Sequence, residues 1–149
     1  MRNIFAVDSS VIVKWFKKGE EHEAEALRLQ HAILSLNLTP LTSELASLEV
    51  TRALLKVGYE TRKVEEAYKT LSEMYSLGFL TTTPLSTLKD AAKDLMIQLN
   101  LYVADALSLA AAYQGDADLL TEDRHLLKQE VQELMKKKRL KVIRLKEFK

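Results

Sequence analysis

One carboxylate, Asp105, stands in the most apolar stretch of this sequence. Between residues 101 and 113, every residue other than Asp105 and Ser108 is apolar or aromatic, so a helix formed here is buried on nearly all sides. A buried charge without a partner is costly, so the carboxyl group either takes up a proton or lies beside a cation. A metal ion is the cation that several carboxylates can share, and oxygen ligands suit Mg²⁺ or Mn²⁺.

Two further acids stand at the ends of expected strands. Residues 4–7 form a short apolar run of the kind that is buried on both faces of a sheet, and this run stops at Asp8. Residues 117–121 form a second short run, and Asp123 follows it. In open α/β sheets, functional groups gather at the carboxyl ends of the strands. We therefore expect Asp8 and Asp123 to meet at one edge of a sheet.

A fourth acid, Glu49, is distinguished from Glu44 by helical spacing. In the helix expected over residues 43–57, Glu49 has Leu45 and Ala53 one turn before and after it, which places it beside the apolar stripe. Glu44 groups with polar residues instead and has the position of a first-turn acid, which the helix dipole favours. We therefore expect Glu49 to point inward and to join the other acids.

The elements that would carry these acids alternate between strands and helices. A helix follows the first strand, capped by Ser9 or Ser10 and broken at residues 17–19. This alternation predicts one α/β domain, residues 1–149, folded as a three-layer α/β/α sandwich around a short, mainly parallel sheet of four or five strands. The expected strands cover residues 4–7, 38–41, 79–83, 117–121 and 140–145, and the longer helices cover residues 20–36, 43–57, 61–77, 86–99, 101–113 and 126–138.

The helix expected over residues 20–36 has one apolar stripe that fits helical spacing. Ala24, Leu27, His31 and Leu34 recur at intervals of three or four residues. We expect this stripe to face the core, with His31 as a core histidine and not a ligand.

A helical hairpin over residues 43–77 carries the tyrosines Tyr59, Tyr68 and Tyr75. Its apolar face is either ordinary core or a contact between subunits. The apolar and aromatic surface exceeds what a domain of this length needs, and we predict a homodimer through the hairpin.

Composition limits the setting in which the chain works. The 149 residues contain no Cys and carry a formal charge of +1, and no window approaches ~18 consecutive apolar residues. Residues 136–149 carry eight Lys or Arg against one Glu, a net charge of +7, so residues 1–135 carry −6. This basic end either contacts phosphates or keeps an edge strand soluble. We expect a cytoplasmic protein without a membrane segment.

Four segments together resemble the motifs of PIN-domain proteins, in particular the VapC-type toxins. The segments are 7–15 (VDSSVIVKW), 48–54 (LEVTRAL), 104–110 (ADALSLA) and 117–124 (ADLLTEDR). The resemblance implies a Mg²⁺- or Mn²⁺-dependent endoribonuclease, a homodimer, and a small antitoxin protein that blocks the site. It also implies an acidic quartet and hydroxyl groups that support it. The quartet would be Asp8, Glu49, Asp105 and Asp123, and the supporting residues would be Ser9 or Ser10 and Thr121.

Two other classes of α/β protein require residues that this chain lacks. A phosphatase of the haloacid dehalogenase type needs a second Asp two residues after the first, where this chain has Ser10. A phosphate-accepting receiver domain needs a Lys after its last core strand, where Arg124 and His125 follow Asp123. Two alternatives stay open because a fold alone does not fix function: a non-catalytic PIN-like module that binds RNA or protein, and an RNA-processing nuclease without an antitoxin.

Overall fold

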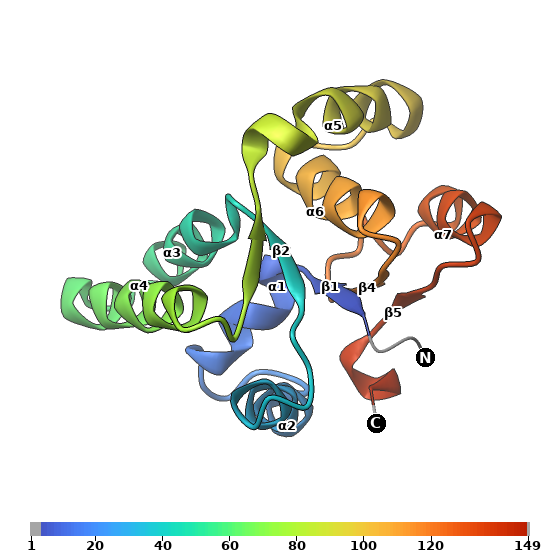
Figure 1. The fold of residues 1–149 in the computed structure, drawn as a ribbon. Helices are drawn as coiled ribbons and strands as arrows, with labels where there is room; N and C mark the ends of the chain where they lie inside the picture. Colours follow the sequence, from blue (N-terminus) through green and yellow to red (C-terminus); the bar gives the residue numbers. More distant parts are fainter. Residues whose placement is uncertain (1–3, 149) are drawn as a thin grey trace.

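The centre of the molecule is a sheet of five parallel strands in the order β3-β2-β1-β4-β5, seen in a computed structural model that describes residues 4–148 (Figure 1). The strands are β1 Phe5–Val7, β2 Leu41–Ser43, β3 Thr81–Thr83, β4 Asp118–Leu120 and β5 Val142–Ile143. The expected parallel sheet is therefore confirmed, and β5 is an edge strand. Because the chain builds one half of the sheet outward from β1 and then returns to β4, the topological switch point lies between β1 and β4.

Helices cover both faces of the sheet. Helices α1 to α4 lie on one side, and α5, α6 and α7 lie on the other (Figure 1). The expected three-layer α/β/α sandwich is confirmed. The helical segments are α1 Ser9–Ile12, η1 Val13–Trp15, α2 Glu23–Leu34, α3 Ala46–Lys56, α4 Thr61–Ser76, α5 Leu85–Leu99, α6 Val103–Gln114, α7 Gln129–Lys137 and η2 Leu145–Glu147.

Alternation along the central strands produces the two cores. Phe5 and Val7 pack into the core under α1 to α4, whereas Ala6 between them packs into the core under α5 to α7. In β4, Leu120 belongs to the first core and Leu119 to the second. Successive side chains of a strand point to opposite faces, so a strand buried on both faces is apolar throughout.

The ends of β2 and α3 differ from the expected ones, and the difference moves Glu44 out of its helix. Thr42 and Ser43 pair with β3, so the strand extends later than expected and α3 begins only at Ala46. The exposed Glu44 accepts a hydrogen bond of 2.8 Å from the backbone N–H of Leu85. Glu44 therefore supports the N-terminus of α5, and the expectation that it is a first-turn acid of its own helix is wrong.

The buried face of α2 also differs from the expected one. Ala26, Leu29 and Ile33 are fully buried, whereas Leu27 and His31 are exposed. The expected stripe is therefore wrong. The buried face of α2 also makes a contact with another element: the Trp15 Nε1–H donates a hydrogen bond of 2.9 Å to the carbonyl oxygen of Ala26.

Among the described residues, no single helix is long and apolar enough to cross a bilayer. Taken together, helices α5 and α6 are long and apolar enough to cross a bilayer by length and composition alone, but a bend of 114° separates them.

Candidate functional site

Asp8 is the most firmly held acid of the sheet edge. The residue is 2% exposed and caps the N-terminus of α1, a position expected for Ser9 or Ser10. Its Oδ2 accepts hydrogen bonds from the Ser10 hydroxyl at 2.6 Å, the Ser10 N–H at 3.2 Å and the Thr121 hydroxyl at 3.1 Å. Its Oδ1 accepts one from the Ser108 hydroxyl at 2.6 Å. These bonds fix the carboxylate in one orientation.

Strand register brings Asp8 to the segment that carries Asp123. Val7 pairs with Leu120 across β1 and β4, so the residues that follow them stand side by side at the switch point. The Ser10 hydroxyl accepts a hydrogen bond of 2.9 Å from the Glu122 N–H, and the Thr121 hydroxyl accepts one of 3.0 Å from the Asp123 N–H. The hydroxyls that contact Asp8 therefore also hold the loop in which Asp123 lies.

Glu49 points toward the same place from α3, as its helical spacing predicts. The Ser9 hydroxyl donates a hydrogen bond of 3.2 Å to its Oε2. Its Oε1 is buried and has no hydrogen-bond partner among the described residues. Burial, followed by the negative charge of Asp8, raises the pKa of the Glu49 carboxyl from 4.5 to about 7. The described residues therefore leave one of the two oxygens of this acid without a hydrogen-bond donor.

Asp105 is the acid that α6 brings to the cluster. It lies in the first turn of this helix and is buried. Burial, followed by the charges of Asp123 and Asp8, raises the pKa of the Asp105 carboxyl from 3.8 to about 7. The structure therefore brings the four acids close enough for their charges to interact.

Helix N-termini partly offset this concentration of negative charge. Asp8 is the N-cap of α1, and Glu49 and Asp105 each lie in the first turn of their helices. The N-terminus of a helix carries a partial positive charge from its free N–H groups. Burial, and after it the remaining repulsion, keeps the pKa values of Glu49 and Asp105 raised.

The carboxylate oxygens of the cluster are suitable ligands for a hard divalent cation such as Mg²⁺. They are not arranged in a complete coordination geometry. Within residues 4–148, no three acidic or histidine side chains are arranged as a group that could hold a metal ion. Asp8 instead receives hydroxyl groups on both of its oxygens. The unpartnered Oε1 of Glu49 and the two raised pKa values fit a cation, because a positive charge would satisfy the first and reverse the second.

Two contacts of this site were not expected from the sequence. Ser108 lies one turn after Asp105 on α6 and donates to Asp8, and its position as the second polar residue of an apolar helix was the available signal. Glu122 accepts hydrogen bonds of 2.9 Å each from Arg144 Nη2 and the Leu145 N–H. Burial opposes its ionisation, but these contacts hold the pKa of Glu122 below its usual value. The basic C-terminal segment thus anchors the loop that carries Asp123.

A cleft of about 500 Å³ opens beside Glu49 and is lined by Ser9, Leu48, Arg52, Lys56 and Ala104, among others. Its walls are apolar except for Glu49, Ser9 and the two cations. A larger hollow of about 600 Å³ lies at the turn between α3 and α4, away from the four acids.

Acids gathered at the switch point of a short parallel sheet define an α/β protein with a candidate cation-dependent site. The model of the PIN domain matches residues 5–131, so the chain belongs to the PIN-domain family. No curated protein sequence matches it. Among solved structures, the chain is similar to one in a toxin-antitoxin complex from Klebsiella pneumoniae, with 18% identity, a TM-score of 0.56, and coverage of 80% of this chain and 86% of that one. At this identity the likeness concerns the fold.

Proposed function

We propose that this chain is a Mg²⁺- or Mn²⁺-dependent endoribonuclease that cleaves RNA phosphodiesters at Asp8, Glu49, Asp105 and Asp123. The observation that carries the proposal is the buried Oε1 of Glu49, which has no partner among the described residues and lies among like charges. Membership of the PIN-domain family supports nuclease activity. The cleft beside Glu49 would give a substrate access to this one of the four acids.

The four acids would hold the cation, and their surroundings in the chain indicate what Asp8, Glu49 and Asp105 would contribute. When bound, the cation supplies positive charge that polarises the phosphodiester and stabilises the charge that develops on cleavage. Asp8 would give the site a fixed point because hydroxyl groups restrain both of its oxygens. Without the cation, the pKa values of Glu49 and Asp105 are about 7, so each of these carboxyl groups can hold or release a proton near neutral pH. The hydroxyls of Ser10 and Thr121 position the loop of Asp123.

Substitution of the acids tests the activity. We expect Asp105→Asn to lower cleavage of single-stranded RNA by orders of magnitude and to weaken Mn²⁺ binding in isothermal titration calorimetry. Glu44→Gln is the matched control, because Glu44 is exposed and serves α5, and we expect it to cleave within twofold of the wild type. Full cleavage by Asp105→Asn would refute the assignment. A wild-type protein that binds RNA without cleaving it would favour a non-catalytic PIN-like module.

We further propose that the chain is the toxin of a type II toxin–antitoxin pair and acts in the cytoplasm. The similar chain of known structure comes from a toxin-antitoxin complex, which supports a small protein partner. A Lys or Arg of that partner would satisfy the repelling carboxylates in place of a metal. The product of the adjacent reading frame, added to the protein in EDTA, is expected to raise its melting temperature and to block cleavage when metal is present. A neighbour without either effect would favour an RNA-processing nuclease that has no antitoxin.

We also propose that the chain forms a homodimer. The part of the hairpin available for the interface is smaller than the sequence indicated. The hydroxyls of Tyr59 and Tyr75 are bonded within the chain to the Lys18 N–H and the Thr42 hydroxyl. Tyr68, 45% exposed, remains available on the outer face of the hairpin. We expect sedimentation equilibrium at micromolar concentration to show a dimer that Tyr68→Glu dissociates. A wild-type monomer of 17.0 kDa would refute the dimer, and an intact Tyr68→Glu dimer would move the interface elsewhere.

A further inference from the structure

Tyr102 and His125 form an aromatic contact between the two segments that carry Asp105 and Asp123. Their ring centroids lie 5.7 Å apart and the ring planes are inclined at 82°, an edge-to-face arrangement that aromatic pairs prefer. Tyr102 is the N-cap of α6, and Asp105 lies in the first turn of that helix. His125 follows Asp123 in the turn after β4. The contact therefore joins the beginning of α6 to this turn.

The two acids on these segments repel each other. Burial is the first cause that raises the pKa of the Asp105 carboxyl to about 7, and the charge of Asp123 is the second. A hydrogen bond between the Asp105 and Asp123 side chains acts in the same direction, which places the two carboxyl groups side by side. When both are ionised, neither can donate this bond and their charges push the segments apart. A contact that does not depend on charge can oppose this repulsion.

Other contacts fix the turn on both sides of His125. The Thr121 hydroxyl accepts the Asp123 N–H on one side, and Leu126 is fully buried on the other. Between them, the His125 N–H donates a hydrogen bond of 2.7 Å to Oδ1 of Asp123. The orientation of the Asp123 carboxylate therefore depends on where His125 lies. Within residues 4–148, the ring that contacts the His125 ring is that of Tyr102.

We propose that Tyr102 is a positioning residue of the acidic site. Its ring holds His125, and the His125 N–H orients the Asp123 carboxylate beside Asp105, so that both acids can contact one cation. The inference rests on the proposed cation-dependent function. It adds to the four acids a side chain that contacts neither the cation nor the RNA. Tyr102 is 73% exposed, so its replacement leaves the core intact.

Two other roles of these rings lead to different results. An exposed aromatic ring can stack on an RNA base, in which case its loss would weaken RNA binding and leave metal binding unchanged. The imidazole of His125 can bind a metal directly, in which case Phe could not replace it. The observed geometry favours the positioning role, because the two rings are directed at each other and the His125 backbone is directed at Asp123.

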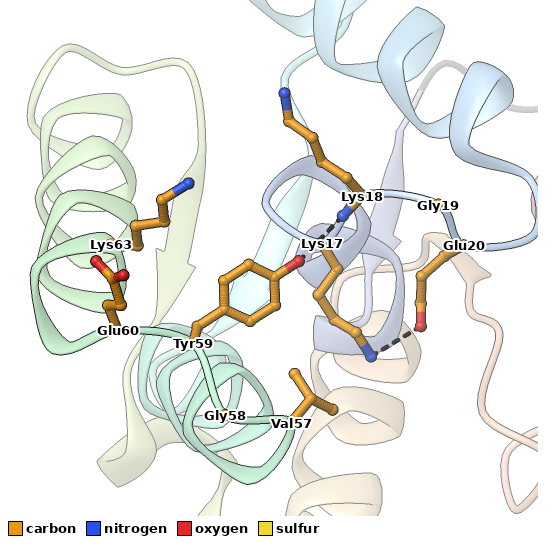
Figure 2. Close-up of a pocket in the computed structure, with 9 residues that line it drawn as sticks. All are labelled: Lys17, Lys18, Gly19, Glu20, Val57, Gly58, Tyr59, Glu60 and Lys63. Carbon is orange, nitrogen blue, oxygen red and sulfur yellow. Dashed lines mark hydrogen bonds and ion pairs between the residues drawn. The ribbon is translucent and has the colours of Figure 1, made fainter.

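Amide hydrogen exchange in the metal-free protein tests the contact without catalysis. The readout is the exchange rate of the His125 N–H, followed by NMR in EDTA. An edge-to-face pair changes an equilibrium about two- to tenfold, so we expect Tyr102→Ala to speed this exchange by about that factor and Tyr102→Phe to leave it unchanged. The control is Val57→Ala. Val57 is 53% exposed at the end of α3 and lines the hollow of about 600 Å³ there (Figure 2).

Mn²⁺ binding, measured by calorimetry, gives a second readout. A site that is correctly arranged for only part of the time has an affinity reduced by that fraction. We therefore expect Tyr102→Ala and His125→Ala each to raise the Kd for Mn²⁺ about three- to tenfold. The double variant should be no weaker than either single variant, because both remove the same contact. Tyr102→Phe and His125→Phe keep a ring pair and should bind Mn²⁺ within twofold of the wild type.

Cleavage kinetics separate positioning from contact with RNA. We expect Tyr102→Ala to raise the Mn²⁺ concentration at half-maximal rate about three- to tenfold. At saturating Mn²⁺, its kcat and its KM for RNA should stay within twofold of the wild type. A raised KM with unchanged Mn²⁺ affinity would overturn the inference and assign the ring to RNA.

The remaining outcomes distinguish this inference from the proposed function. Loss of Mn²⁺ binding in His125→Phe but not in Tyr102→Phe would overturn the inference and make His125 a ligand. Additive losses in the double variant would also overturn it, because the two rings would then act separately. Faster exchange of the His125 N–H in Tyr102→Ala, in a protein that neither binds Mn²⁺ nor cleaves RNA, would support the contact and reject the nuclease alone. Unchanged exchange in an active nuclease would do the reverse.

Discussion

Glu49→Gln should make the metal-free protein more stable at neutral and alkaline pH, although it removes an acid from the proposed active site. Folding raises the pKa of the Glu49 carboxyl from 4.5 to about 7. A group whose folded pKa is raised favours the folded state most while both states are protonated. This contribution is lost as the pH rises from about 4.5 to about 7, because the unfolded chain ionises first. Above that window the folded state carries the full cost of the charge.

The size of the effect follows from the same shift. One pKa unit corresponds to about 1.4 kcal/mol, so the full shift corresponds to about 3 kcal/mol. Glu49 is only half-buried, and water screens part of its interaction, so we expect a gain of about 1.5 to 3 kcal/mol. For a chain of this length, that gain raises the melting temperature by about 4 to 10 °C. The Gln side chain keeps an oxygen for the Ser9 hydroxyl and brings an N–H group to the neighbouring carboxylates.

Thermal denaturation in EDTA at pH 8 and pH 5 measures this prediction. The gain should be largest at pH 8 and fall below about 1 kcal/mol at pH 5, where the folded wild type already holds the proton. Millimolar Mn²⁺ should reverse the order of stability, because it binds the wild-type folded state more tightly. Glu44→Gln keeps an acceptor for the Leu85 N–H and should change stability by less than about 0.5 kcal/mol at either pH. A gain of equal size at both pH values, or a loss at pH 8, would refute the charge argument.

Three substitutions test the groups that hold the acids. Asp8→Asn should lower the unfolding free energy by about 2 kcal/mol in EDTA, because an amide nitrogen cannot accept the hydroxyl bonds that Asp8 accepts, and an unchanged melting temperature would contradict this. Ser108→Ala should cost about 1 kcal/mol in the same assay, whereas Ser72→Ala, at an exposed position of α4, serves as its control. Arg144→Ala should cost about 1 to 2 kcal/mol by leaving Glu122 without its cation and should weaken Mn²⁺ binding in calorimetry. Mn²⁺ affinity equal to the wild type would show that the loop does not depend on this pair.

The order and type of the main elements could be predicted because local pattern decides them. The apolar run of residues 5–7 must be buried on both faces, and the structure places its alternate side chains in two cores. The amphipathic stripe of 61–77 corresponds to α4, Thr61–Ser76. The inward direction of Glu49 followed from its phase relative to Leu45, the N-cap of α3, and Ala53 within the helix. This relation holds within about two turns of one helix.

The errors arose where contacts between distant segments decide the outcome. In α2, two stripes fit helical spacing, and the buried one contains Ala26, whose carbonyl oxygen receives the Trp15 N–H from another element. Glu44 supports the N-terminus of a helix 41 residues further along the chain. Periodicity within one segment carries no information about either contact, because both depend on how separate elements pack.

In the acidic cluster, the charged residues could be predicted from the sequence, whereas their hydrogen-bond partners could not. Burying a charged group costs free energy, so an acid in an apolar helix or directly after a buried strand needs a reason to be there. Asp105 and Asp8 therefore stand out in the sequence. A serine in a helix and an arginine in a basic tail are ordinary by comparison, yet Ser108 lies 100 residues from Asp8 in the chain and donates to it at 2.6 Å. Hydrogen bonds of this kind make a crowded carboxylate tolerable, and which residue donates them is fixed only when β1, β4 and α6 have assembled.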